Sequence, residues 1–145
     1  MKLTQQLTDF ARVTSDGKLD MFGAGWTIVS ANEPPEFFVA GMLQIPYDQT
    51  NDADHTIRVE LLDADGASVV NLDGDPICVA ATIRVARTPE LKPAIPVDFP
   101  FVFRFGPHPL SPGRYEIRTT INGEQREDWS LPFTIREAMP EELAA

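Results

Sequence analysis

The chain has 145 residues, of which 43% are hydrophobic, and this composition argues for one domain with a real core and against a disordered chain. Its formal net charge of −10 disfavours nucleic acid and anionic membranes as partners, because binding to either needs a basic surface. Only one cysteine is present, so an intramolecular disulfide is excluded, and the start of the chain carries no apolar signal segment. We therefore expect a protein of a reducing compartment.

Apolar and polar residues alternate with a period of two along much of the chain, as in half-buried antiparallel strands. The thirteen prolines argue against long helices, and Asp-Gly, Pro-Gly and Asn-Gly turn signals separate the alternating runs. The pattern predicts an all-β sandwich or barrel of about eight or nine strands, with a single domain over residues 1–137 and a tail over 138–145. The predicted strands span residues 6–14, 18–30, 37–46, 56–63, 67–72, 77–87, 97–105, 114–121 and 129–136.

Gly23-Ala24-Gly25 lies inside the second predicted strand. It resembles a phosphate-binding loop only superficially, because no third glycine or Lys-Ser/Thr pair follows. We interpret it as a bulge or a close backbone approach, with Trp26 behind it as a core residue. Phe101, Phe103 and Tyr115 are predicted to lie in the same core.

Residues 37–45 are apolar on both faces, although a half-buried strand should show polar residues on one of them. Phe37, Val39, Leu43 and Ile45 are expected to point inward. The outward positions, Phe38, Ala40 and Met42, are the candidate interface. Either loops or termini of the same chain cover them, or a second copy does, which predicts a homo-oligomer.

The acidic residues concentrate between positions 48 and 75, where eight acids face one arginine, for a net charge of −7. Oxygen-rich loops at residues 48–54 and 63–75 make a calcium- or carbohydrate-binding module the alternative function. Asx turns and a solvated face explain the same residues, because neither loop has a complete calcium-binding pattern. By contrast, residues 84–118 carry a net charge of +3, and such asymmetry steers association.

No catalytic constellation is recognisable. His55, His108 and Cys78 are the residues that could act as a base, a nucleophile or zinc ligands, and none lies in a suitable spacing. We therefore expect neither an enzyme nor a cofactor or metal site. Before the strand at 114–121, Leu110-Ser111-Pro112-Gly113-Arg114-Tyr115 indicates either a tyrosine corner or a simple turn followed by a core tyrosine.

The segment from Asp16 to Thr27, with Gly17-Lys18-Leu19 followed by Gly23, Gly25 and Trp26, resembles the opening of a family of small proteins of unknown function from actinobacteria and their bacteriophages. Residues 61–66 and 112–115, then Trp129, Pro132 and Phe133, stand where that family places a hairpin, a turn and its last strand. The resemblance implies an immunoglobulin-like or related antiparallel β-sandwich without known catalytic residues. The missing catalytic site, the strand that is apolar on both faces and the charge asymmetry favour a non-catalytic protein that acts through protein–protein contacts. The resemblance implies in addition a structural or accessory protein of an actinobacterium or its phage, located in the host cytoplasm or in the virion.

Overall fold

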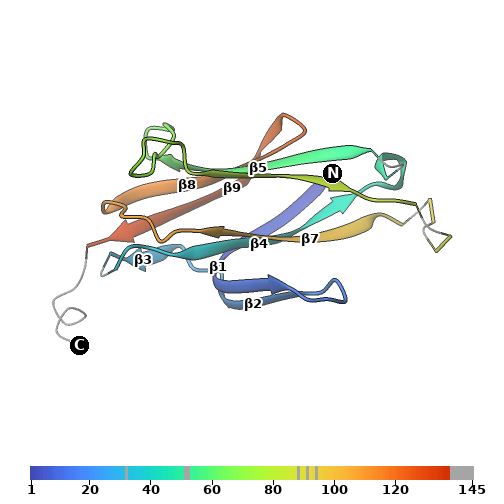
Figure 1. Ribbon diagram of the computed structural model, residues 1–145, viewed down its shortest axis with the longest axis horizontal. Helices are drawn as coiled ribbons and strands as arrows, with labels where there is room; N and C mark the ends of the chain where they lie inside the picture. The colour runs from blue at the N-terminus through green and yellow to red at the C-terminus, as the bar shows by residue number, and fades with distance from the viewer. Residues whose placement is uncertain (32, 51–52, 88, 91, 94, 138–145) are drawn as a thin grey trace.

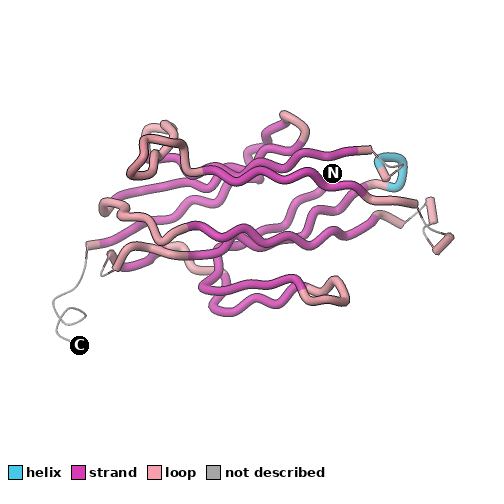
Figure 2. Tube along the Cα trace, viewed as in Figure 1, coloured by secondary structure: helices cyan, strands magenta, loops and turns pink. Residues whose placement is uncertain are grey.

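The computed structural model describes residues 1–137 except 32, 51–52, 88, 91 and 94, and over these residues the protein is almost entirely β (Figure 1; Figure 2). Nine strands in the described part of the chain form two packed sheets, and a short 3-10 turn spans Tyr47–Gln49. The predicted all-β sandwich of eight or nine strands is therefore confirmed. The predicted tail at 138–145 lies outside the described residues.

The first sheet has four strands in the order β2 (Leu19–Ala24), β1 (Lys2–Val13), β4 (Phe37–Ile45) and β7 (Val97–Phe105). The second has five, in the order β3 (Ile28–Ser30), β9 (Glu124–Arg136), β8 (Gly113–Ile121), β5 (Asp54–Asp63) and β6 (Cys78–Arg84). Among the described residues, neighbouring strands are antiparallel except β3 and β9, which run parallel. With β1, β4 and β7 as strands A, B and E, and β5, β6, β8 and β9 as C, C′, F and G, the connectivity is that of an immunoglobulin-like sandwich.

Two of the predicted strands are wrong in detail. The run at 18–30 divides into β2 and β3, and the two segments join different sheets. The run at 67–72 forms no strand, because tight turns at residues 63–67 and 71–75 flank it and leave only the isolated bridges Leu62–Ser68 and Val70–Pro76. β1 also begins at Lys2 rather than at residue 6.

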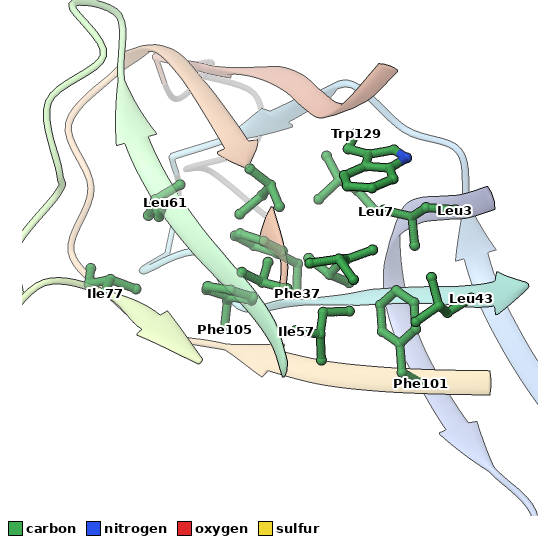
Figure 3. Packing of buried hydrophobic residues seen from close by; sticks show 14 of the residues in the cluster. Leu3, Leu7, Phe37, Leu43, Ile57, Leu61, Ile77, Phe101, Phe105 and Trp129 are labelled. Atoms are coloured by element: carbon green, nitrogen blue, oxygen red, sulfur yellow. The ribbon is translucent and has the colours of Figure 1, made fainter. Parts of the chain in front are cut away.

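The core fills the space between the sheets, where inward side chains of β1, β4 and β7 meet those of β5, β8 and β9 (Figure 3). Phe37, Val39, Leu43 and Ile45 are buried as predicted, and so is Phe101. Trp26, Phe103 and Tyr115 are only partly buried and pack against the edge of the core, so the prediction overstated their burial. The tryptophan at the centre is Trp129, which is 1% exposed.

Tyr115, near the start of β8, makes the tyrosine corner, because its hydroxyl donates a hydrogen bond to the carbonyl oxygen of Ser111 at 2.6 Å. This bond fixes the crossover that enters β8, which corresponds to strand F. Burial, first, and the nearby charge of Asp63 raise the pKa of the Tyr115 phenol above its ordinary value.

Gln5 of β1 joins the two sheets along one edge of the sandwich. Its Nε2 donates to the carbonyl oxygen of Trp129 at 3.1 Å, and its Oε1 accepts from Thr119 Oγ1 at 2.9 Å. The β8–β9 ladder breaks between Arg118 and Thr120, and Trp129 lies in the part of β9 that this break leaves out of register. The Gln5 amide therefore supplies hydrogen bonds where the ladder has none.

Candidate interaction surface

The second half of β1 and all of β2 form a hairpin that extends from the first sheet and projects away from the rest of the sandwich (Figure 1; Figure 2). β1 pairs with β4 from Lys2 to Thr8, and with β2 from Thr8 onward. The chain leaves the sandwich after Thr8 and returns at Gly25, whose N–H donates to the Leu7 carbonyl oxygen at 3.0 Å. Residues 9–24, which we call the arm, are thus an insertion between strand A and the short segment β3 that pairs with strand G.

The base of the arm explains the Gly-Ala-Gly sequence. Gly23 has φ +62° and Gly25 has φ +85°, conformations that side-chain-bearing residues rarely adopt. A Cβ at Gly23 would in addition collide with the carboxylate of Asp9 on the facing strand. The β1–β2 register runs through Gly23 without a shift, so the predicted bulge does not form, and Gly23 instead marks a close approach of its backbone to the Asp9 side chain.

Apolar side chains are exposed on both faces of the arm. Phe10 and Phe22, which face each other across the two strands, are 47% and 55% exposed, and Val13 and Met21 on the opposite face are 42% and 40% exposed. The Phe10 and Phe22 ring centroids lie 5.9 Å apart, and the Phe10 ring lies 5.4 Å from that of Phe38 on β4. A row of three aromatic rings therefore runs from the outer edge of the arm onto the first sheet.

This row of rings reaches the candidate interface on β4 that was predicted from the sequence. Phe38 and Met42 lie on the outer face of β4 and are half-buried, whereas Ala40, between Gln6 of β1 and Val102 of β7, is fully buried. Phe10 contacts Phe38, so the arm of the same chain covers part of this face. The sequence pattern does not predict the arm, because residues 18–30 were interpreted as one strand. The available signal in the sequence was Phe22 beside two glycines.

The charges on the arm are paired. Arg12 Nε lies 3.0 Å from Asp20 Oδ2 across the two strands, and Lys18 Nζ lies 3.4 Å from Asp16 Oδ2 at the tip. Asp9 is the remaining charged residue of the arm. The arm therefore carries a net charge of −1, whereas the whole chain carries −10. The arm is therefore nearly neutral although the protein is strongly acidic.

The two histidines and the cysteine lie in separate places. His55 is buried, with Nε2 at 2.7 Å from the Gln49 carbonyl oxygen and Nδ1 at 3.0 Å from Asn122 Nδ2, so both ring nitrogens are engaged within the fold. His108 lies half-buried after β7, and Cys78 is exposed on β6. Among the described residues, no group of three or more His, Cys, Asp or Glu side chains could hold a metal ion.

The acidic loop 63–75 consists of two turns of the same design. Asp63 Oδ1 accepts hydrogen bonds from the backbone N–H groups two and four residues later, at 2.9 and 3.0 Å. Asn71 Oδ1 does the same at 2.9 and 3.1 Å. These side-chain oxygens serve their own Asx turns. The other acidic loop, 48–54, is described except for residues 51–52.

The strand order and the tyrosine corner define the protein as an immunoglobulin-like β-sandwich, here with an inserted arm. The chain belongs to the family of unknown function DUF6941, whose sequence profile matches residues 4–136. A comparison with curated proteins finds no match.

Among solved structures, the alkylpurine DNA glycosylase AlkC of Pseudomonas fluorescens, bound to DNA containing an abasic site analog, has a part that aligns with this chain. The TM-score is 0.36 and the sequence identity 11%, over 91% of this chain and 30% of that one. The chain thus spans less than a third of the length of that enzyme, and a likeness this distant carries no functional argument. Over the described residues, no helix has the length and apolarity needed to cross a membrane.

Proposed function

We propose that this protein is a non-catalytic module that works through contacts with other protein chains, and that the arm is its contact surface. The observation that carries the proposal is where the exposed apolar side chains gather. The described residues include eight exposed large hydrophobic side chains, and four of them, Phe10, Val13, Met21 and Phe22, belong to the arm.

The physics of a hairpin supports this assignment. An isolated two-stranded hairpin is marginally stable in water, and it gains stability only when a further strand or a packed surface covers it. The arm contacts its own sandwich through Phe10, whose ring lies against that of Phe38, and its outer aromatic, Phe22, stays more than half exposed. A contiguous apolar surface of this kind is typical of an interaction site.

The polar groups that would serve the competing functions are used within the fold. His55 holds two loops together through its ring nitrogens, and Asp63 and Asn71 close their own turns. These contacts favour protein binding over catalysis at His55 and over a cation at the loop 63–75.

The resemblance stated above adds a cellular setting to the proposal: a structural or accessory protein of an actinobacterium or its phage, located in the host cytoplasm or in the virion. Gene neighbourhood tests this part. Capsid or tail genes beside the coding sequence support the virion setting, and a neighbourhood of host metabolic genes contradicts it.

The biochemical test compares the full chain with a variant that lacks the arm. Since Thr8 and Ala24 are the innermost facing pair at the base, replacement of residues 9–23 by Asn-Gly closes the strands with a two-residue turn. Both tagged chains are purified from cells that also express the untagged chain, and the bound proteins are quantified by mass spectrometry. We expect bound protein, either another copy or a different chain, that the arm-less variant loses. If the two chains recover the same proteins, the proposed function is wrong.

A further inference from the structure

We infer that the partner of the arm is the arm of a second copy, and that two chains pair their β2 edges around a two-fold axis. This inference rests on the proposed function and names the partner for the same surface. β2 lies at the end of its sheet, with β1 on one side and, in the part of the chain that the structure describes, no strand on the other. An unpaired edge next to exposed apolar side chains is a template for another strand.

Pairing along the β2 edges would stabilise the arm, which as a two-stranded hairpin is only marginally stable. Two arms joined along β2 give a four-stranded ribbon in the order β1, β2, β2, β1, which exceeds the three strands needed for independent stability. A two-fold axis perpendicular to the ribbon pairs β2 with itself in antiparallel orientation and consumes both edges. The assembly is then a closed dimer and not a growing fibre.

The same axis brings the aromatic rows of the two chains together. It keeps each face of one arm on the same side as the corresponding face of the other, so Phe10 and Phe22 of both copies share one face. The row that begins at Phe38 would continue across the axis into the second chain. Cross-strand aromatic pairs are among those that stabilise sheets most.

Charge favours a second copy over a basic partner protein. The arm carries −1 with its cations paired to acids, so two arms meet without strong repulsion even though each chain carries −10. A basic partner would instead be attracted to residues 48–75, where the net charge is −7. The neutral, apolar arm is thus suited to its own copy.

The size of the interface limits the expected affinity of the dimer. The arm supplies about sixteen residues, fewer than the roughly 20–30 that each side of a standard stable interface contributes. We therefore expect a dimer with a dissociation constant in the micromolar range. Sedimentation velocity between about 1 and 200 μM covers the transition from monomer to dimer.

Phe22 provides the test because it is exposed in the single chain and lies at the middle of β2. When β2 pairs with itself along its length, the two Phe22 side chains come close to the axis. Phe22→Glu should weaken dimerisation by about thirty-fold or more, because two carboxylates then meet there. Phe22→Lys should do the same. A mixture of the two variant chains should associate again, because opposite charges then face each other.

Leu72→Glu is the matched control, since Leu72 is 88% exposed and lies outside the arm. It should leave the dimer unchanged, and the Asn-Gly replacement of residues 9–23 should abolish it. A parent chain that sediments as a monomer at 200 μM overturns the inference. So does a dimer that survives Phe22→Glu, or a mixture of the charged variants that stays monomeric. If the parent is monomeric but captures a different protein through the arm, the proposed function stands and only the second copy is wrong.

Discussion

Gln5 offers the sharpest test of how the sandwich is closed. Gln5→Met keeps the length of the side chain and removes both of its polar groups. The Thr119 hydroxyl, which is fully buried, then loses its acceptor, and the Trp129 carbonyl oxygen loses a donor where the β8–β9 ladder is interrupted. We expect the substitution to destabilise the fold through these two orphaned groups.

The cost follows from burial. A buried polar group without a partner costs about 1–3 kcal/mol, so two such groups should lower the free energy of unfolding by roughly 2–6 kcal/mol. Thr119→Val removes only one of the bonds and leaves the Gln5 oxygen, which is partly exposed and can bind water, so about 1 kcal/mol is expected. In the double variant the hydroxyl is absent, and the total should be smaller than the sum of the single effects by about 1 kcal/mol.

The free energy of unfolding is measured for the parent, the two single variants and the double variant by urea unfolding at 25 °C and pH 7. Tryptophan fluorescence and circular dichroism follow the transition. The two probes must give the same transition and the slopes must agree, so that differences in midpoint report stability. If Gln5→Met unfolds within about 0.5 kcal/mol of the parent, or if the two substitutions are additive, the amide does not hold the sheets together as the structure implies.

Further predictions concern the core, the tyrosine corner and the acidic loops. Trp129→Ala should cost about 3–5 kcal/mol in urea unfolding, and Trp26→Ala clearly less, because Trp26 is only partly buried. Gly41→Ala should cost about 1–3 kcal/mol in the same assay, because the added Cβ collides with the Thr4 carbonyl oxygen. Because the pKa of Tyr115 is raised in the fold, its contribution to stability is complete below pH 10 and is lost as the pH rises through the raised value. Thermal melts from pH 8 to 11 should therefore show an alkaline decline that Tyr115→Phe flattens. Millimolar Ca²⁺ should leave the melting temperature unchanged, and a rise of several degrees would favour the ligand-binding alternative.

Local patterns were sufficient to predict most of the sandwich. Alternation located β5, β7 and β8 closely, because each has one face in the core and the period of a strand is fixed, and a continuous apolar run located β4. The turn signals and Tyr115 predicted the crossover before β8, since both depend on nearby residues. The inward side of β4 was also correct, because the inward positions hold large aliphatic and aromatic side chains.

Features that depend on pairing between distant segments were not predictable. Trp129 and Trp26 both lie in alternating runs, so the sequence does not distinguish them. The packing of the two sheets buries Trp129 more deeply than Trp26. The bonds of Gln5 depend on a register shift between β8 and β9, more than a hundred residues away. Periodicity carries no information about such a shift.

The arm shows the same limit at the surface. Residues 18–24 have the alternation of a core strand, yet their apolar side chains meet solvent, because their only partner strand is the end of β1. What distinguishes them in the sequence is the pair Gly23 and Gly25, whose left-handed backbone turns the hairpin away from the sandwich. An apolar pattern that continues after the chain has left its own core leaves an exposed apolar surface of the kind that marks interaction sites. The alternation and the two glycines are therefore the sequence features on which the proposed packing of the arm against another chain rests.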